Sequence, residues 1–113
     1  MFTDNVIKVN SFNLKQDRVL ILTTLNVYNF KKKQLKRKIP INSVLAITKN
    51  TKNDKEFVLH VPTQYDYRFY ADNRDEFLDL LKLRFANLVP QKTLRVFGIG
   101  ASTLKDFTTT FKD

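Results

Sequence analysis

Basic side chains are the residues of this chain whose types and spacing could do chemistry. The segment Lys31–Lys38 (KKKQLKRK) has six basic residues in eight positions. A second set, formed by Lys8, Lys15 and Arg18, precedes it in the chain. The lysine ammonium group and the forked arginine guanidinium both bind phosphate oxygens well. These two sets are therefore candidates for binding a partner that carries phosphate.

The net charge of the chain is concentrated in its first third. The 113 residues include 20 Lys and Arg against 11 Asp and Glu, which gives a formal charge of +9. Residues 8–38 contain nine basic residues and a single acid, Asp17. A local excess of this kind indicates an anionic partner, either a membrane or a nucleic acid, unless the cations serve only to keep the surface solvated.

The segment Lys31–Lys38 itself has these same three interpretations. Each cation near anionic lipid contributes about 1 kcal/mol of attraction. A basic run of this density also occurs in nuclear-localisation and nucleic-acid-binding segments. Strand-type nucleic-acid binders place aromatic side chains among the basic ones so that bases can stack, whereas here Tyr28 and Phe30 only precede the run. The sequence therefore favours a membrane and makes nucleic acid the weaker alternative.

Residues suited to catalysis or metal binding are scarce. The chain has no cysteine, and His60 is its one histidine, so neither a cysteine-ligated metal nor a histidine cluster is expected. Asp75 and Asp79 share a helix face but suit the positive end of a helix dipole. Gly98 and Gly100 lack the third glycine and the Lys-Ser/Thr pair of a phosphate loop. We expect a binding protein, not an enzyme, with no cofactor and no metal.

The elements that must position the basic residues are mostly β-strands, because apolar and polar residues alternate along the chain. We predict seven strands, over residues 6–10, 18–22, 26–30, 35–39, 44–48, 56–61 and 65–71. In the fourth strand, alternation places Arg37 with Ile39 on one face and Lys36 with Lys38 on the other.

A helix follows the strands. Asn73 and Glu76 have the spacing of a capping box, and Pro90 ends the apolar pattern that begins there. This predicts one amphipathic helix over residues 73–88. Beyond it we expect a strand over residues 94–97, a turn at Gly98 and Gly100, and a short extended piece within residues 102–111.

Two groups of large side chains are predicted to fill the core. The first shares one face of the seventh strand: Tyr65, Tyr67 and Phe69. The second forms the apolar face of the helix: Phe77, Leu80, Leu81 and Leu88. Together these features predict a mainly β fold, a barrel of about seven antiparallel strands capped by one C-terminal α-helix. A single domain spans residues 1–113, with a core over 6–88 and a post-helix extension over 92–112.

No targeting or membrane-spanning segment is expected. The first ten residues lack the basic head and apolar run of a signal peptide. No apolar run reaches the roughly 18–20 residues that a membrane-spanning helix needs.

Four segments carry a resemblance to a known fold. They are RVLILTTLNVYNF (18–30), LKRKIPINSVLAIT (35–48), EFVLHVP (56–62) and YDYRFYADNRDEFLDLL (65–81). In their order and spacing they resemble the pleckstrin-homology (PH) superfold, most closely the tail homology 1 domain of class I myosins and the PH-like domains of some protist protein kinases. The resemblance covers residues 6–88, and the chain departs from it in having no tryptophan in the final helix.

The resemblance implies a peripheral membrane-targeting module within a larger protein. It implies binding to phosphoinositides and phosphatidylserine at the cytoplasmic face of a membrane. The alternative that it leaves open is a protein-interaction module, since many PH-like domains bind peptides or small GTPases.

Eight basic residues form the predicted lipid-binding set: Lys8, Lys15, Arg18, Lys31, Lys32, Lys33, Lys36 and Lys38. If the first two strands pair, the loop between them overhangs the same barrel end as the turn at residues 31–33, so the cations of both would converge there.

The spacing from Lys8 to Arg18 is similar to that of the tail homology 1 lipid-binding pair. The Lys/Arg-x-Arg spacing of many PH domains is not met, however, and Asp17 precedes Arg18. These features favour a diffuse basic patch over a head-group pocket. They predict that replacing Lys31, Lys32 and Lys33 together weakens liposome binding more than replacing Lys8 and Arg18.

Overall fold

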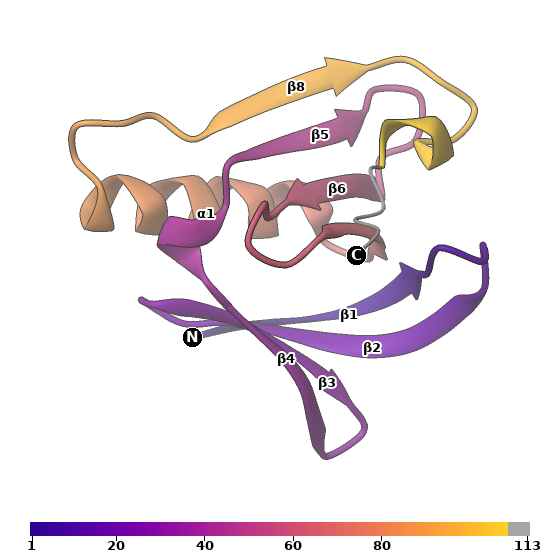
Figure 1. The fold of residues 1–113 in the computed structure, drawn as a ribbon, viewed down its shortest axis with the longest axis horizontal. Coiled ribbons are helices and arrows are strands. Elements are labelled where there is room, and N and C mark those ends of the chain that lie inside the picture. Colours follow the sequence, from indigo (N-terminus) through magenta and orange to yellow (C-terminus); the bar gives the residue numbers. More distant parts are fainter. Residues whose placement is uncertain (109–113) are drawn as a thin grey trace.

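The computed structural model describes residues 1–108, which form one eight-stranded sheet and one α-helix (Figure 1). The strands are β1 (Phe2–Val9), β2 (Lys15–Leu22), β3 (Asn26–Lys31), β4 (Gln34–Pro40), β5 (Ala46–Asn50), β6 (Glu56–His60), β7 (Asp66–Ala71) and β8 (Arg95–Ile99). The helix is α1 (Arg74–Leu88), and two 3₁₀ turns cover Ile41–Ser43 and Lys105–Phe107.

The strand order is β4-β3-β2-β1-β7-β6-β5-β8. Antiparallel pairing runs from β4 to β5 through this order, and β1 joins the two halves by pairing with both β2 and β7. The predicted antiparallel architecture with one C-terminal helix is confirmed.

The post-helix strand β8 differs from the expectation, because it pairs in parallel with β5 and includes Gly98. A turn had been expected at Gly98. A Cβ atom at this position would lie 3.0 Å from Thr51 Cγ2, so glycine lets the strand approach its neighbour closely.

The helix covers the sheet with the apolar face that the sequence predicts. Phe77 and Leu81 are fully buried, and the ring of Phe77 lies 5.8 Å from that of Phe57 between centroids. Leu80 is only half-buried. The placement of Leu88 in the core was wrong: this last residue of the helix is 37% exposed, and the next residue, Val89, packs against the core instead.

The predicted capping box at Asn73 is also wrong. Asn73 does occupy the N-cap position, but its side chain makes no capping hydrogen bond to the helix. Instead its side-chain amide donates to Asp4 Oδ1 at 3.2 Å, and its backbone N–H donates to Asp4 Oδ2 at 2.9 Å. The buried carboxylate of Asp4 therefore holds the start of the helix against β1.

A hydrogen bond to a buried carboxylate holds the segment after β8 against the sheet. Glu56 is fully buried, and it accepts hydrogen bonds from Leu104 N–H at 2.9 Å and from Arg68 Nε at 2.8 Å. Leu104 is also fully buried. A 3₁₀ turn over Lys105–Phe107 follows it, in place of the extended piece expected within residues 102–111. The last part of that piece, residues 109–111, lies outside the described residues, as does the end of the extension over 92–112.

Within residues 1–108, no helix combines the length and the apolar character needed to cross a membrane.

Candidate functional site

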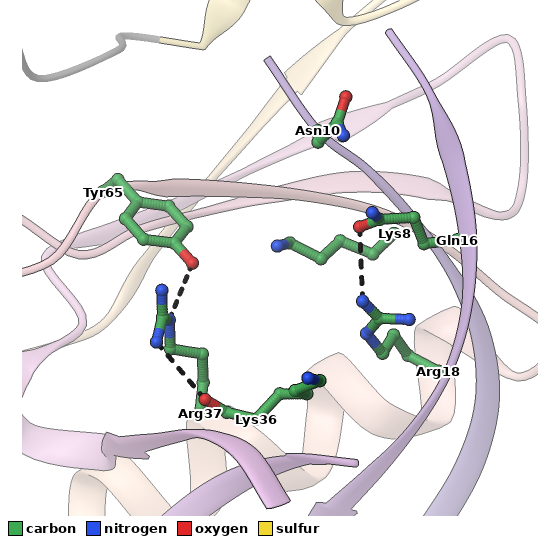
Figure 2. A pocket seen from close by; sticks show the side chains of 7 residues that line it. All are labelled: Lys8, Asn10, Gln16, Arg18, Lys36, Arg37 and Tyr65. Carbon is green, nitrogen blue, oxygen red and sulfur yellow. Dashed lines mark hydrogen bonds between the residues drawn. The ribbon is translucent and has the colours of Figure 1, made fainter. Parts of the chain in front are cut away.

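A polar pocket of about 340 Å³ opens between β1, β2, β4 and the turn that leads into β7 (Figure 2). Seven residues line it: Lys8, Asn10, Gln16, Arg18, Lys36, Arg37 and Tyr65. Four of these are cations, and none of the seven is a carboxylate. The volume suits a small ligand, and the lining suits one that carries negative charge.

Strand alternation places two of the cations. In β1, Lys8 follows the buried Val6 by two residues, and in β2, Arg18 precedes the buried Leu20 by two residues. Residues two apart share a face of a strand, so both cations extend the core-facing side beyond the apolar layer. The register pairs Lys8 with Gln16 and Val6 with Arg18, which makes Lys8 and Arg18 diagonal neighbours.

A β-bulge places the other two cations, Lys36 and Arg37. The register between β3 and β4 pairs Asn29 with Arg37 and then Phe30 with Leu35, which leaves Lys36 without a partner across the strands. Because a bulge breaks the alternation of side chains, the consecutive residues Lys36 and Arg37 both line the pocket. The expectation that they lie on opposite faces was wrong for this reason.

Tyr65 forms the wall opposite β1 and β2, as Figure 2 shows. Its hydroxyl accepts a hydrogen bond from Arg37 Nε at 2.8 Å, and Lys8 Nζ lies 5.6 Å from its ring centroid. Burial opposes ionisation of this phenol, but the hydrogen bond from Arg37 and the nearby charge of Lys8 lower the pKa of Tyr65 below its ordinary value. Of the three aromatic residues expected in the core, Tyr67 and Phe69 are fully buried, whereas Tyr65 is only partly buried and packs against the edge of the core.

The pocket cations are not neutralised by acids. Among the residues that the structure describes, no carboxylate forms an ion pair with Lys8, Arg18, Lys36 or Arg37. Arg18 donates to neutral oxygens, the backbone carbonyl of Asp17 at 2.8 Å and Gln16 Oε1 at 3.4 Å. Its Nε is buried and has no hydrogen-bond partner within residues 1–108. The result is a concentrated positive potential that favours an anion.

The other predicted cations lie outside the pocket. Lys15 is on the opposite face of β2, with Nζ 5.9 Å from the ring centroid of Tyr70. Three exposed lysines, Lys31, Lys32 and Lys33, form the tip of the β3–β4 hairpin, which projects from the body of the molecule in Figure 1. Exposed Lys38 pairs across the hairpin with Tyr28. The structure thus brings together Lys8, Arg18 and Lys36 from the predicted set of eight.

Four lining residues were not predicted from the sequence: Asn10, Gln16, Arg37 and Tyr65. A signal for Arg37 was present, because alternation placed it on the same face as the buried Ile39. A cation on a core-facing position needs a polar cavity. No comparable signal marks Asn10 or Gln16, whose positions depend on the pairing of β1 with β2.

The chain matches one family over nearly its whole length. A family model described as "Unconventional myosin tail, actin- and lipid-binding" matches residues 1–106. The chain is 30% identical over 94 residues to myosin IF heavy chain of Dictyostelium discoideum, covering 80% of this chain and 9% of that protein. It is 32% identical over 88 residues to myosin heavy chain IB of Acanthamoeba castellanii, covering 71% of this chain and 8% of that protein. The chain thus spans less than a tenth of the length of these relatives.

Solved structures share the fold. The N-terminal PH domain of human ARAP2 superposes with a TM-score of 0.67 at 13% identity, covering 89% of this chain and 92% of that one. The Slm1 PH domain in complex with inositol-4-phosphate superposes with a TM-score of 0.60 at 17% identity, covering 75% and 94%. These similarities confirm the predicted PH-like fold.

Proposed function

This chain belongs to the unconventional myosin tail family, described as actin- and lipid-binding, and we propose that it binds the phosphorylated head group of an anionic lipid in the pocket of Lys8, Arg18, Lys36 and Arg37. The single observation that carries this proposal is the convergence of four cations, free of ion pairs within the described residues, on one cavity. The resemblance to the tail homology 1 domain stated from the sequence is confirmed by the family match.

The chemistry of the lining suits a head group with more than one phosphate. The guanidinium groups of Arg18 and Arg37 are forked donors, which bind phosphate oxygens in pairs, whereas Lys8 and Lys36 act as point charges. Cations on three different strands hold fixed positions relative to one another. A fixed arrangement can select phosphates by their spacing, and this favours a head-group pocket over the diffuse patch expected from the sequence.

The hairpin tip has a second part in this proposal. Lys31, Lys32 and Lys33 are exposed and do not line the pocket, so each contributes a general attraction of about 1 kcal/mol to anionic lipid. Phosphatidylserine would be sufficient for this contribution. The hairpin would thus bring the chain to the membrane, and the pocket would select the phosphoinositide.

The proposed role is attachment, not catalysis. The relatives are long heavy chains, so this unit would connect a larger protein to a membrane, peripherally and at its cytoplasmic face. A protein-interaction module remains the alternative from another class, and nucleic-acid binding is the weaker one.

Vesicle sedimentation tests the proposal. Phosphatidylcholine vesicles, vesicles with phosphatidylserine and vesicles with phosphatidylinositol 4,5-bisphosphate at matched total charge are compared at low and physiological salt. We expect no binding to the first, salt-sensitive binding to the second and the tightest binding to the third. Strong binding to RNA without binding to anionic vesicles would support the nucleic-acid alternative. Binding to neither would support the protein-interaction alternative.

A further inference from the structure

The segment that follows β8, residues 100–108, covers the face of the sheet that is opposite the helix. Phe57 of β6 packs against Phe77 of the helix, so alternation turns its neighbours Glu56 and Val58 to the other face. Both are fully buried there. Leu104 is fully buried as well, and neither it nor Val58 belongs to the main core. The backbone N–H of Leu104 donates to Glu56 Oε2 at 2.9 Å, which docks the segment on this face.

Asn50, at the end of β5, binds the same segment at a second point. This fully buried side chain donates from Nδ2 to the carbonyl of Ala101 at 2.8 Å and to Glu56 Oε1 at 2.8 Å. Both carboxylate oxygens of Glu56 therefore accept hydrogen bonds, and one of the donors, Leu104, belongs to the docked segment. Detachment of the segment would remove that donor and let water reach the carboxylate.

Arg68 connects this carboxylate to the turn between β1 and β2. Its Nε donates to Glu56 Oε2 at 2.8 Å, and its Nη1 donates to Asn13 Oδ1 in the turn at 3.2 Å. Arg68 is only 6% exposed, and hydrogen bonds of a charged group are stronger where water is excluded. One guanidinium thus joins the carboxylate that holds residues 100–108 to the turn at residues 10–14.

The turn at residues 10–14 borders the cationic pocket. Asn10 lines the pocket, and its Oδ1 accepts hydrogen bonds from the N–H groups of Phe12 at 2.9 Å and Leu14 at 3.0 Å. The strands on either side of the turn carry Lys8 and Arg18. In Figure 1 this turn and the yellow 3₁₀ turn of the docked segment both lie on the right-hand side of the view. The position of the turn therefore affects one wall of the pocket.

We propose that docking of residues 100–108 keeps the pocket in the form that binds a phosphorylated head group, with Glu56 and Arg68 as positioning residues between the two. The inference rests on the proposed function of the pocket. When the segment detaches, water reaches the pair of Glu56 and Arg68 and weakens its attraction, so Arg68 no longer holds Asn13. Coupling between two sites is reciprocal, so a head group in the pocket must favour the docked segment. A partner that binds residues 100–108 away from the sheet would lower head-group affinity.

Amide hydrogen exchange of the unmodified chain, followed by NMR, tests the coupling from the side of the ligand. Saturation with inositol 1,4,5-trisphosphate should slow the exchange of the Leu104 N–H several-fold, because the segment then detaches less often. The control is the N–H of Val89, which donates to the carbonyl of Phe85 at the end of the helix and should exchange at the same rate with and without ligand. An unchanged rate at Leu104 with the pocket occupied would overturn the proposal.

A double-mutant cycle tests the same coupling from the side of the protein. Leu104→Ala removes the buried side chain of the segment. Asn13→Gly removes the acceptor of Arg68 and still permits the positive φ of 62° at this position. Each variant should lower the affinity for inositol 1,4,5-trisphosphate roughly fivefold, and the two together should lower it no further, because both break one connection. Phe107→Ala, at a 41% exposed position of the same segment, is the matched control and should bind like the parent. Losses that multiply would show that the two positions act separately, which would overturn the proposal.

A measurement without ligand keeps this inference apart from the proposed function. In the Leu104→Ala variant the N–H groups of Phe12 and Leu14 should exchange several-fold faster than in the parent, because the turn is held less firmly. Unchanged exchange of these two amides would overturn the coupling and leave the pocket standing. Failure of the unmodified chain to bind inositol 1,4,5-trisphosphate would instead overturn the pocket as the binding site.

Discussion

The guanidinium of Arg37 in β4 donates a 2.8 Å hydrogen bond from Nε to the hydroxyl of Tyr65, which precedes β7. Arg37 lies in β4 and Tyr65 lies just before β7, and these strands are not neighbours in the sheet, since β3, β2 and β1 lie between them. Their contact therefore closes the side of the pocket that faces Lys8 and Arg18 (Figure 2), and it fixes one of the arginines of the pocket. It also lets an uncharged phenol orient a guanidinium that we propose to bind phosphate.

Removing the Tyr65 hydroxyl tests this control. The Tyr65→Phe variant keeps the ring and loses the acceptor of Arg37 Nε. The affinity for inositol 1,4,5-trisphosphate should fall roughly 3- to 10-fold, as expected for the loss of one hydrogen bond, and isothermal titration calorimetry would measure it. Tyr28→Phe alters a hydroxyl outside the pocket and should leave the affinity unchanged. Unchanged affinity in Tyr65→Phe would show that the contact does not orient Arg37 for binding.

Tyr65 also predicts a pH dependence. Its pKa lies below the ordinary value of about 10, whereas burial raises the pKa of Tyr67 and Tyr70. A phenolate at Tyr65 would place a negative charge beside Arg37, so head-group affinity should decline as the pH rises through this lowered pKa. Phenolate absorbance in the near ultraviolet would follow the ionisation, and Tyr65→Phe should lack the early part of that titration. An identical curve for parent and variant would contradict the assignment.

The helix contributes to stability through its fully buried side chains. Phe77→Ala or Leu81→Ala should lower the free energy of unfolding by about 2–5 kcal/mol, because each change leaves a cavity in the core. Leu83→Ala, at a position that is 56% exposed on the same helix, is the matched control and should change stability by less than about 0.5 kcal/mol. Urea denaturation would measure all three. A Phe77→Ala protein as stable as the parent would show that the helix does not close the sheet in solution.

Buried Glu56 makes stability depend on acid. Burial opposes its ionisation, but hydrogen bonds from Asn50, Leu104 and Arg68 outweigh this and lower the pKa of Glu56 below its ordinary value. A carboxylate with a lowered folded-state pKa contributes stability above its unfolded-state pKa, and this contribution is lost as the pH falls through the folded-state pKa. Denaturant midpoints of the parent should thus decrease toward acid pH.

The Glu56→Gln variant should lack this part of the acid dependence. It should also be less stable at neutral pH by about 3–5 kcal/mol, because Arg68 would remain buried without its partner charge. Asp54→Asn removes a carboxylate from an exposed turn, and its denaturant midpoint should fall toward acid pH as steeply as that of the parent. A midpoint of Glu56→Gln that falls as steeply as that of the parent would contradict the role of Glu56.

Alternation and apolar periodicity were sufficient to predict the architecture. The apolar pattern depends on residues close in sequence. It was therefore sufficient to predict the series of strands, the helix and the burial of Phe77 and Leu81. The parallel pairing of β8 was beyond this reasoning, because it joins segments that are far apart in the sequence: Gly98 pairs with Lys49 of β5. The role of Asn73 was misassigned for a similar reason: its partner, Asp4, lies in the first strand.

The pocket was only partly predictable. Lys8 and Arg18 could be paired from their spacing, since both flank one hairpin. The bulge that turns Lys36 to the side of Arg37 has no signature in the run of basic residues, because it depends on the register with β3. Tyr65 alternates with the core residues Tyr67 and Phe69. It differs from them in lying just before the start of β7, where the core ends and the pocket begins.

Two multiple variants should distinguish the contribution of the pocket to lipid binding from that of the hairpin tip. Lys8→Ala with Arg18→Ala removes two pocket cations, and it should abolish binding of inositol 1,4,5-trisphosphate and the preference for phosphatidylinositol 4,5-bisphosphate over phosphatidylserine at matched charge. Lys31→Ala, Lys32→Ala and Lys33→Ala together should preserve both properties and yet lose more binding to phosphatidylserine vesicles, by about 1 kcal/mol per cation. The sequence alone predicted that the triple variant would lose more liposome binding than the double variant, whichever anionic lipid was used. If the pocket binds the head group as we propose, that prediction should hold only for lipids without a phosphorylated inositol. If the double variant keeps its inositol phosphate affinity while the triple variant loses all lipid binding, the surface acts as a diffuse patch and the pocket is not the binding site.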